Sequence, residues 1–186
     1  KPSAASEKKA FRNFLIYIKR FSTAAIDLCD IQLNVHKQQK VMAKQISTEI
    51  VINATPQKIW AILTDFDNYS RWNPFIKSIT GPVAVGNTIT TRIEPPEAQG
   101  MTFKPTVLVF EANKEFRWRG KLIIPGLFDG EHIFQLTDNG NGTTTFLQSE
   151  LFYGILVPLF KKMLDTNTLD GFKQMNQKLK EIAEKS

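Results

Sequence analysis

The stretch that decides the fold covers residues 46–75 and reads ISTEIVINATPQKIWAILTDFDNYSRWNPF. Its first part, 46–53, is rich in β-branched side chains and partly alternates between apolar and polar residues, which predicts a strand. Thr55 followed by Pro56 is typical of a helix start, with the hydroxyl as N-cap and the proline at the first helical position. A second short helix is predicted over 65–72. The folded domain is therefore expected to begin with one strand followed by two short helices.

Downstream of this stretch, the helical period disappears for about 80 residues. Glycine, proline and asparagine mark short turns between further runs of strand character. These runs lie at 75–80, 87–93, 102–111, 114–122, 127–137 and 143–153. Pro105 cannot donate a ladder hydrogen bond, so it predicts an edge or a bulge within its run. The even spacing of the runs is typical of an antiparallel meander.

The last part of the chain is predicted to form one long amphipathic helix. Apolar side chains recur three or four residues apart from Val157 to Ile182, over roughly seven turns. This apolar stripe must cover the apolar face of the sheet. The sequence therefore predicts an α+β fold in which a seven-stranded antiparallel sheet wraps around the long C-terminal helix, with two short helices after the first strand.

Three polar residues are predicted on the inward face of the last two strands. The glycine-rich turn between these strands predicts a register with Leu136 opposite Thr144. In that register the inward face carries His132, Gln148 and Glu150 among several phenylalanines. A buried carboxylate is costly unless it is hydrogen-bonded or protonated, and His132 is a diagonal neighbour able to donate to Glu150. Two interpretations remain open: a satisfied structural pair or rim residues that reach water, and polar contacts that orient a ligand in an apolar pocket.

A cavity is expected between the sheet and the last helix. A long twisted sheet curls away from a straight helix, so one helix does not fill the whole concave face. For each apolar residue that faces this space, ordinary core packing is the alternative to ligand contact. We expect the lining to consist of Trp72, Phe75, Ile93, Phe103, Trp118, His132, Phe134, Gln148, Glu150, Phe152, Phe160, Leu164 and Phe172.

The positive charge is concentrated near the start of the chain. The net charge is +6, and residues 1–41 carry eight basic and three acidic side chains, which leaves residues 42–186 nearly neutral. A near-neutral domain lacks the basic stripe that phosphate binding needs, so nucleic acid is not an expected partner. Apolar side chains at helical spacing among lysines and arginines predict a basic amphipathic helix over 8–21.

Two interpretations of residues 1–41 remain open. One is a targeting segment or a helix that makes peripheral contact with a membrane surface. The other is a leader, or a segment foreign to the native protein, because Met42 directly precedes the first strand. In either case residues 42–186 are predicted to form the ligand-binding domain.

Several classes of site are excluded by the residues present. Cys29, His36 and His132 are the only soft metal ligands, and none has the paired spacing of a metal site. The sequence has no nucleophile motif and no glycine-rich phosphate loop, so neither a metal nor another cofactor is expected. No apolar run reaches the roughly 18 residues that span a bilayer, and a cytoplasmic location is expected. The sequence carries no signal for an oligomeric state.

Four segments resemble one known family. Residues 50–75, with 103–107 (FKPTV), 127–132 (LFDGEH) and 150–154 (ELFYG), resemble the SRPBCC superfamily of START-like and polyketide cyclase/dehydratase-like proteins. The resemblance covers roughly residues 46–183, and it implies a helix-grip fold with a deep cavity for hydrophobic small molecules. Gln148 stands where many relatives have histidine, so an inward histidine pair is not carried over to this chain.

The aromatic inward faces and the resemblance together favour a binding function. We expect the binding or transport of a small hydrophobic molecule, such as a lipid, a quinone or a polyketide-like compound, in an internal cavity. The alternative is an enzyme similar to the polyketide cyclases and dehydratases, in which His132 or Glu150 moves a proton within the cavity. A protein-interaction module is a third class, for which the sequence shows no exposed patch.

Overall fold

A computed structural model describes residues 43–121 and 124–185 of the chain. The amphipathic helix predicted over 8–21, and the two interpretations of residues 1–41, lie outside the described residues.

Strands and helices follow one another in nearly the predicted order. The strands are β1 (Lys44–Ile52), β2 (Ile76–Thr80), β3 (Thr90–Ile93), β4 (Met101–Phe103), β5 (Thr106–Glu111), β6 (Glu115–Lys121), β7 (Asp129–Asp138) and β8 (Thr144–Tyr153). The helices are α3 (Pro56–Thr64), the 3-10 turn η1 (Phe66–Asn68), α4 (Tyr69–Trp72), α5 (Val157–Met163), the π-helical turn η2 (Leu164–Thr168) and α6 (Leu169–Lys185). The start of α3 is capped as predicted, because Lys58 N donates to Thr55 Oγ1 at 3.4 Å.

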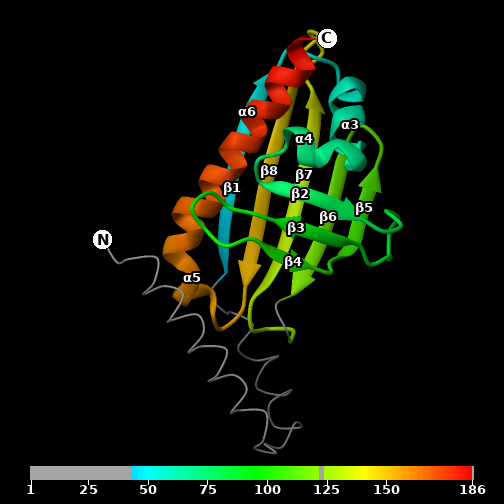
Figure 1. Cartoon of the computed structure of the whole chain (residues 1–186). Coiled ribbons are helices and arrows are strands. Elements are labelled where there is room, and N and C mark those ends of the chain that lie inside the picture. The colour runs from blue at the N-terminus through cyan, green and yellow to red at the C-terminus, as the bar shows by residue number, and fades with distance from the viewer. Residues whose placement is uncertain (1–42, 122–123, 186) are drawn as a thin grey trace, which may run out of the picture. The chain divides into compact units, whose positions relative to one another are not determined.

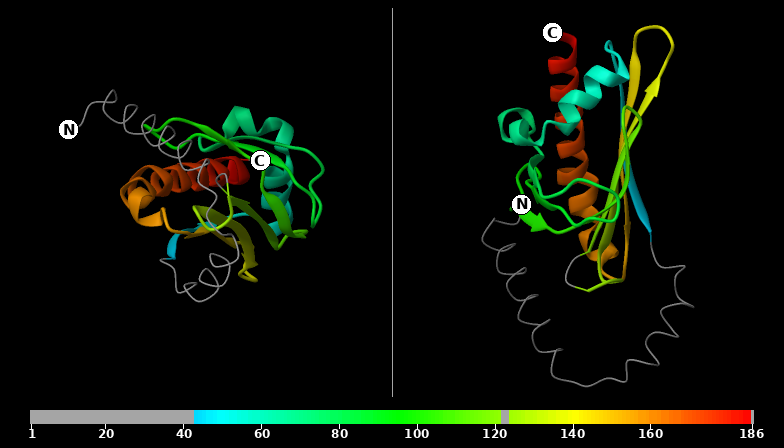
Figure 2. Two further views of the ribbon diagram at one scale, coloured as in Figure 1. Left: turned by 90° about the horizontal axis from the view of Figure 1, so that it is seen from below. Right: turned by 90° about the vertical axis from the view of Figure 1, so that its right-hand side faces the viewer.

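Two antiparallel sheets lie in different layers. The large sheet has the order β1-β8-β7-β6-β5, and the small sheet has the order β2-β3-β4. Figure 1 shows the small sheet crossing one face of the large sheet, beside the long C-terminal helix. Seen from the side in Figure 2, the helices and the small sheet all cover this same face. The predicted α+β helix-grip architecture is confirmed.

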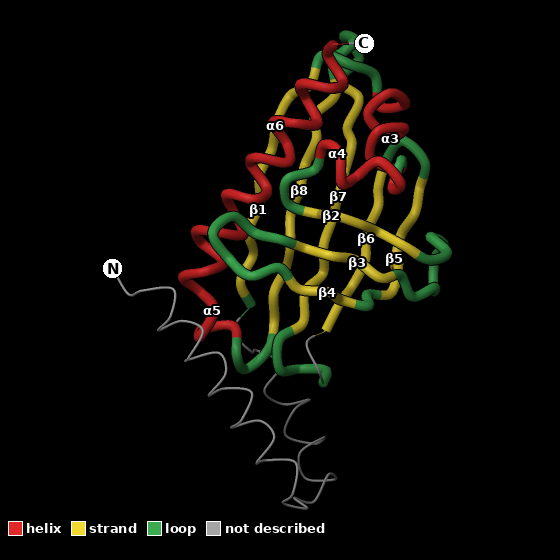
Figure 3. Tube along the Cα trace, viewed as in Figure 1, coloured by secondary structure: helices red, strands yellow, loops and turns green. Residues whose placement is uncertain are grey.

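The predicted number of strands and sheets is wrong. One sheet of seven strands is expected from the sequence, whereas the structure has eight strands in two sheets. Figure 3 shows the strands of the two sheets crossing one another. The run 102–111 is divided at Pro105, which has no N–H to continue a ladder. The carbonyl oxygen of Pro105 instead accepts a hydrogen bond of 2.9 Å from Ile89 N, and Thr88 bridges Thr106. The segment before β3 thus joins the small sheet to the start of β5.

The predicted register of the last hairpin is also wrong, by two residues. Leu136 lies opposite Phe146 rather than Thr144, and Asp138 takes the place opposite Thr144. The hairpin closes later than predicted because Asn139 N donates to Thr143 O at 3.1 Å, which makes the turn shorter. A shift of two residues leaves every side chain on its predicted face, because the side-chain period of a strand is two.

The C-terminal helix is not a regular α-helix throughout. A single helix is predicted from Val157 onward, but the π-helical turn η2 separates α5 from α6. A π turn places one extra residue in the helix, and such turns often lie at functional sites. Two buried side chains of this turn, Leu164 and Thr168, face the interior of the domain.

Candidate functional site

A cavity lies between the large sheet, the small sheet and the π-helical turn η2. Its volume is about 70 Å³. Most of its walls are apolar, and they come from β3 and β4 on one side, from β6 and β8 on the other, and from Met163 and Leu164 of the C-terminal helix. Two residues of the lining reach solvent: Phe128 is half-buried and Lys121 is exposed. They mark the side at which the cavity approaches solvent.

The predicted site residues divide into two groups. Those that line the cavity are Phe75, Ile93, Phe103, Trp118, Glu150, Phe152 and Leu164. Those that do not line it are Trp72, His132, Phe134, Gln148, Phe160 and Phe172. Most of the second group is buried directly behind the lining, and His132 for example stacks on Trp118 with ring centroids 4.6 Å apart and parallel planes. Trp72 packs on Tyr69 and Phe160 packs on Phe128, both at the margins of the domain core.

The structure brings the three predicted polar residues together. Glu150 is the direct cross-strand partner of His132, and its Oε2 lies 3.2 Å from His132 Nδ1. Gln148 Nε2 lies 3.3 Å from the other ring nitrogen, Nε2. Both contacts are satisfied by a neutral imidazole that donates from Nδ1 to the carboxylate and accepts from the Gln148 amide at Nε2. His132 therefore holds the Glu150 carboxylate in place from behind.

A glycine makes the position of this carboxylate possible. Gly130 lies on the neighbouring strand β7 and lines the cavity. A Cβ atom at this position would lie 2.5 Å from Glu150 Oε1. Any Cβ at this position would force the carboxylate to move, so the glycine leaves room for Oε1 where it now lies. Of the two carboxylate oxygens, Oε2 contacts His132 and Oε1 lies over Gly130, at the cavity wall.

Thr91 is a site residue that sequence analysis missed. It is fully buried on β3 and borders the cavity, and its Oγ1 has no hydrogen-bond partner among the described residues. An unsatisfied buried hydroxyl costs about 1–3 kcal/mol. Thr91 precedes Ile93 by two residues, so strand alternation places it on the face predicted for Ile93. The alternation could have revealed its direction, but not that its hydroxyl is unpaired.

Other lining residues were missed although a signal was present. Met101 lies two residues before Phe103 on the same strand, and Thr168 lies four residues after Leu164 on the same helix face. Phe128 and Gly130 precede His132 at the same alternation as the predicted inward face. The side-chain periods of the strands and the helix could therefore have added these four residues to the predicted lining.

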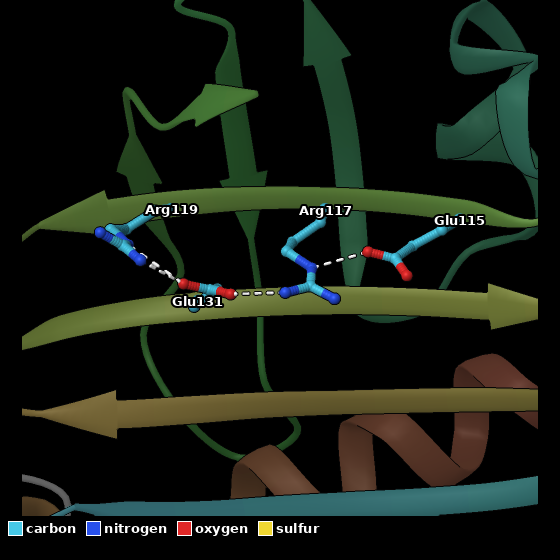
Figure 4. A network of polar contacts seen from close by, with 4 residues as sticks. All are labelled: Glu115, Arg117, Arg119 and Glu131. Carbon is cyan, nitrogen blue, oxygen red and sulfur yellow. Dashed lines mark hydrogen bonds and ion pairs between the residues drawn. The ribbon is translucent and has the colours of Figure 1, made fainter. Parts of the chain in front are cut away.

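A second cluster of charged residues lies on the outer face of the large sheet, away from the cavity. Figure 4 shows Arg117 between Glu115, at 2.7 Å, and Glu131, at 3.1 Å, and Arg119 bound to Glu131 at 2.6 Å. Burial alone would lower the pKa of Arg117, but its hydrogen bonds to the two glutamates raise it above the ordinary value. Because all four charges are paired with one another, this cluster is not a candidate ligand site.

In residues 43–121 and 124–185, no three His, Cys, Asp or Glu side chains come together in a way that could hold a metal ion. No helix within those same ranges has both the length and the apolar character that crossing a bilayer requires.

Comparison with known families gives one match over most of the chain. The family model described as polyketide cyclase/dehydrase and lipid transport matches residues 43–184. No curated protein sequence matches this chain.

Solved structures of similar fold come from several bacteria. The Zhui aromatase/cyclase of Streptomyces has a TM-score of 0.63 and 11% identity, over 77% of this chain and 94% of that one. A START superfamily protein of Mycobacterium smegmatis has a TM-score of 0.58 and 21% identity, over 75% and 97%. A Staphylococcus aureus protein of unknown function has a TM-score of 0.59 and 13% identity, over 78% and 96%. At these identities the likeness concerns the fold.

Proposed function

The chain belongs to the polyketide cyclase/dehydrase and lipid transport family, within the SRPBCC superfamily, and we propose that it binds a small, mainly apolar ligand in the cavity beside η2. The observation that carries this proposal is the fully buried, unpaired hydroxyl of Thr91 at the wall of a mainly apolar cavity. A buried hydroxyl that destabilises the empty protein is explained if a ligand supplies its missing partner.

The polar groups of the lining define what the ligand must present. The Glu150 carboxylate accepts hydrogen bonds and is already held through Oε2, so its other oxygen accepts from a ligand donor. A ligand carboxylate at this place would bring two negative charges together at low dielectric, which is unfavourable. The matching ligand is therefore a neutral apolar compound with a hydroxyl group, such as a phenol or a lipophilic alcohol.

The size of the cavity determines how such a ligand enters. Dry cavities of about 150 Å³ hold benzene, so a cavity of about 70 Å³ must widen before an aromatic alcohol fits. The connection between β3 and β4, residues 94–100, contributes Pro95 to the cavity wall and is followed by a strand of only three residues. It is attached to η2 by one hydrogen bond of 2.7 Å, from Asn167 Nδ2 to Pro96 O. Outward movement of this connection provides the additional volume.

A titration with 1-naphthol tests the proposal. This probe is a neutral, fluorescent, apolar alcohol, and its fluorescence should change saturably when it binds to the full chain. Thr91→Val keeps the shape of the side chain but removes the hydroxyl, so it should weaken binding about fivefold, the equivalent of one net hydrogen bond. The control is Thr137→Val on the exposed end of β7, which should leave the affinity unchanged. Equal affinities for wild type and Thr91→Val would exclude the assigned site.

The His132–Glu150 pair favours one second candidate, an enzyme that uses the pair for proton transfer. A carboxylate held by histidine at the wall of a cavity is able to accept a proton from a bound substrate. Glu150→Gln retains a hydrogen-bonding group but removes the base. If this variant bound 1-naphthol normally and lost all turnover of a poly-β-ketone cyclisation substrate that the wild type converts, the enzyme would be favoured over the carrier.

A further inference from the structure

Three exposed apolar side chains gather at one end of the large sheet. Ile124 lies in the loop before β7, and Ile155 and Leu159 lie in the segment that follows β8 and enters α5. Their exposed fractions are 55%, 64% and 66%, respectively. Single exposed apolar residues are common on protein surfaces, but a contiguous exposed group usually marks an interaction site. These three residues are called the apolar tip below.

Backbone hydrogen bonds hold the two loops of the apolar tip together. Ile155 N donates to Gly126 O at 3.2 Å, and Leu156 N donates to Leu127 O at 3.0 Å. Gly154 adopts a positive φ of 133°, and a Cβ atom there would collide with the backbone of Leu127. Figure 1 shows both loops at the same end of β7 and β8, the lower end in that view. Gly126 and Leu127 of the one loop are therefore held beside Ile155 and Leu156 of the other.

Lysines surround the apolar tip. Lys121 is the last residue of β6, and Lys161 and Lys162 follow Leu159 in α5. All three are exposed, and among the described residues none of them forms an ion pair. Lysines elsewhere in this part of the chain are often paired, for example Lys178 with Glu181 at 2.8 Å. The tip thus combines exposed aliphatic side chains with unpaired positive charge.

We propose that the apolar tip docks on the surface of an anionic lipid bilayer, with Ile124, Ile155 and Leu159 inserted among the acyl chains and the three lysines against the headgroups. Aliphatic residues beside lysines are the combination that binds to such a surface, through apolar burial and charge attraction together. A second copy of the chain does not fit the tip, because symmetric pairing would bring the two sets of lysines together.

The cavity opens toward the same end. Lys121 and Phe128 line it, and the ring of Phe128 packs on Phe160, the residue after Leu159, with centroids 5.0 Å apart. A domain docked through the tip would therefore present the cavity entrance to the lipid. Docking itself does not depend on the proposed function, because it involves no cavity ligand.

Vesicle binding by the full chain tests the docking. The full chain should co-sediment with vesicles made of equal parts phosphatidylglycerol and phosphatidylcholine, and much less with phosphatidylcholine alone. The double variant Lys161→Gln/Lys162→Gln should lose roughly 25-fold in affinity, about fivefold for each lysine near an anionic surface. Its matched control, Lys173→Gln/Lys178→Gln, removes the same charge from α6 and should bind as the wild type does.

The apolar contribution is tested separately. Ile124→Ser/Ile155→Ser/Leu159→Ser should lower the affinity by more than about tenfold, whereas Val85→Ser, at an equally exposed valine of another loop, should not change it. Unchanged far-UV circular dichroism of each variant verifies that the fold is intact. The proposal is overturned if no vesicle is bound, if binding is the same for all variants, or if the tip variants alter only self-association.

Discussion

At the scale of single residues, replacing the unpaired hydroxyl of Thr91 should have opposite effects on stability and on ligand binding. Thr91→Val removes a buried polar atom without a partner, so the empty variant should be more stable than the wild type by about 1–2 kcal/mol. Urea unfolding of the ligand-free protein measures this difference in the free energy of unfolding.

A second buried threonine provides the matched control. Thr144 is as buried as Thr91, but its Oγ1 donates to Ala54 O at 2.7 Å. Thr144→Val leaves that carbonyl oxygen without its donor and should destabilise the protein by about 1–2 kcal/mol. Destabilisation by both substitutions would show that the Thr91 hydroxyl has a partner after all.

Because of the buried phenol of Tyr69, we expect the protein to become less stable at alkaline pH. Its phenol is fully buried and donates to Leu63 O at 2.5 Å, and burial raises its pKa far above the ordinary value. Above pH 10 the unfolded chain releases the phenolic proton while the folded protein keeps it, so the free energy of unfolding falls by about 1.4 kcal/mol per pH unit for this group. Below pH 10 its contribution does not change with pH.

Denaturant unfolding between pH 9 and pH 11.5 measures this effect. Tyr69→Phe should lower stability at pH 9, because the substitution removes the hydrogen bond to Leu63 O. Above pH 10 the stability of the variant should fall less steeply than that of the wild type. The same slope in the variant and the wild type would assign the alkaline loss to other groups.

The polar group of the site was largely predictable at this scale, whereas its register was not. Alternation alone places His132, Gln148 and Glu150 on one face, and a two-residue shift in the turn does not change that face. The shift does change the partner of His132 from Gln148 to Glu150, which creates the carboxylate–imidazole contact. Turn length follows from backbone hydrogen bonds between Asn139 and Thr143, which the glycine-rich sequence does not determine.

At the scale of secondary-structure elements, the connection 94–100 is expected to control entry to the cavity. Asn167→Ala removes its hydrogen bond to η2 and should make the open state easier to reach by about 1 kcal/mol. The association rate of 1-naphthol, measured by stopped-flow fluorescence, should rise roughly fivefold. The control is Gln174→Ala, at an exposed residue of α6, and it should leave the rate unchanged. If the Asn167 variant also had the wild-type rate, movement of this connection would not limit entry of the ligand.

The elements were predicted in type and order, and the exceptions have local causes. Pro105 predicted an interruption in its run, and the structure places the boundary between β4 and β5 there. The π-helical turn had no such signal, because apolar residues three and four apart continue through it. A π turn adds one residue to a helix without interrupting this apolar spacing, so the period of the sequence does not reveal it.

At the scale of the whole molecule, the two crossing sheets explain why a cavity exists. The small sheet and the C-terminal helix cover one face of the large sheet, and residues of all three line the cavity. The sequence predicted a space under a curved sheet. The small volume of this space depends on where the connection 94–100 lies, and no feature of the sequence indicates that position. The same arrangement places the cavity entrance beside the apolar tip.

A crystal structure of the full chain with bound 1-naphthol would locate the ligand. We expect the naphthol ring in the cavity beside Thr91, with its hydroxyl within hydrogen-bonding distance of Glu150 Oε1 and the connection 94–100 moved outward. A naphthol bound only at the surface, with the cavity as narrow as in the free protein, would contradict it.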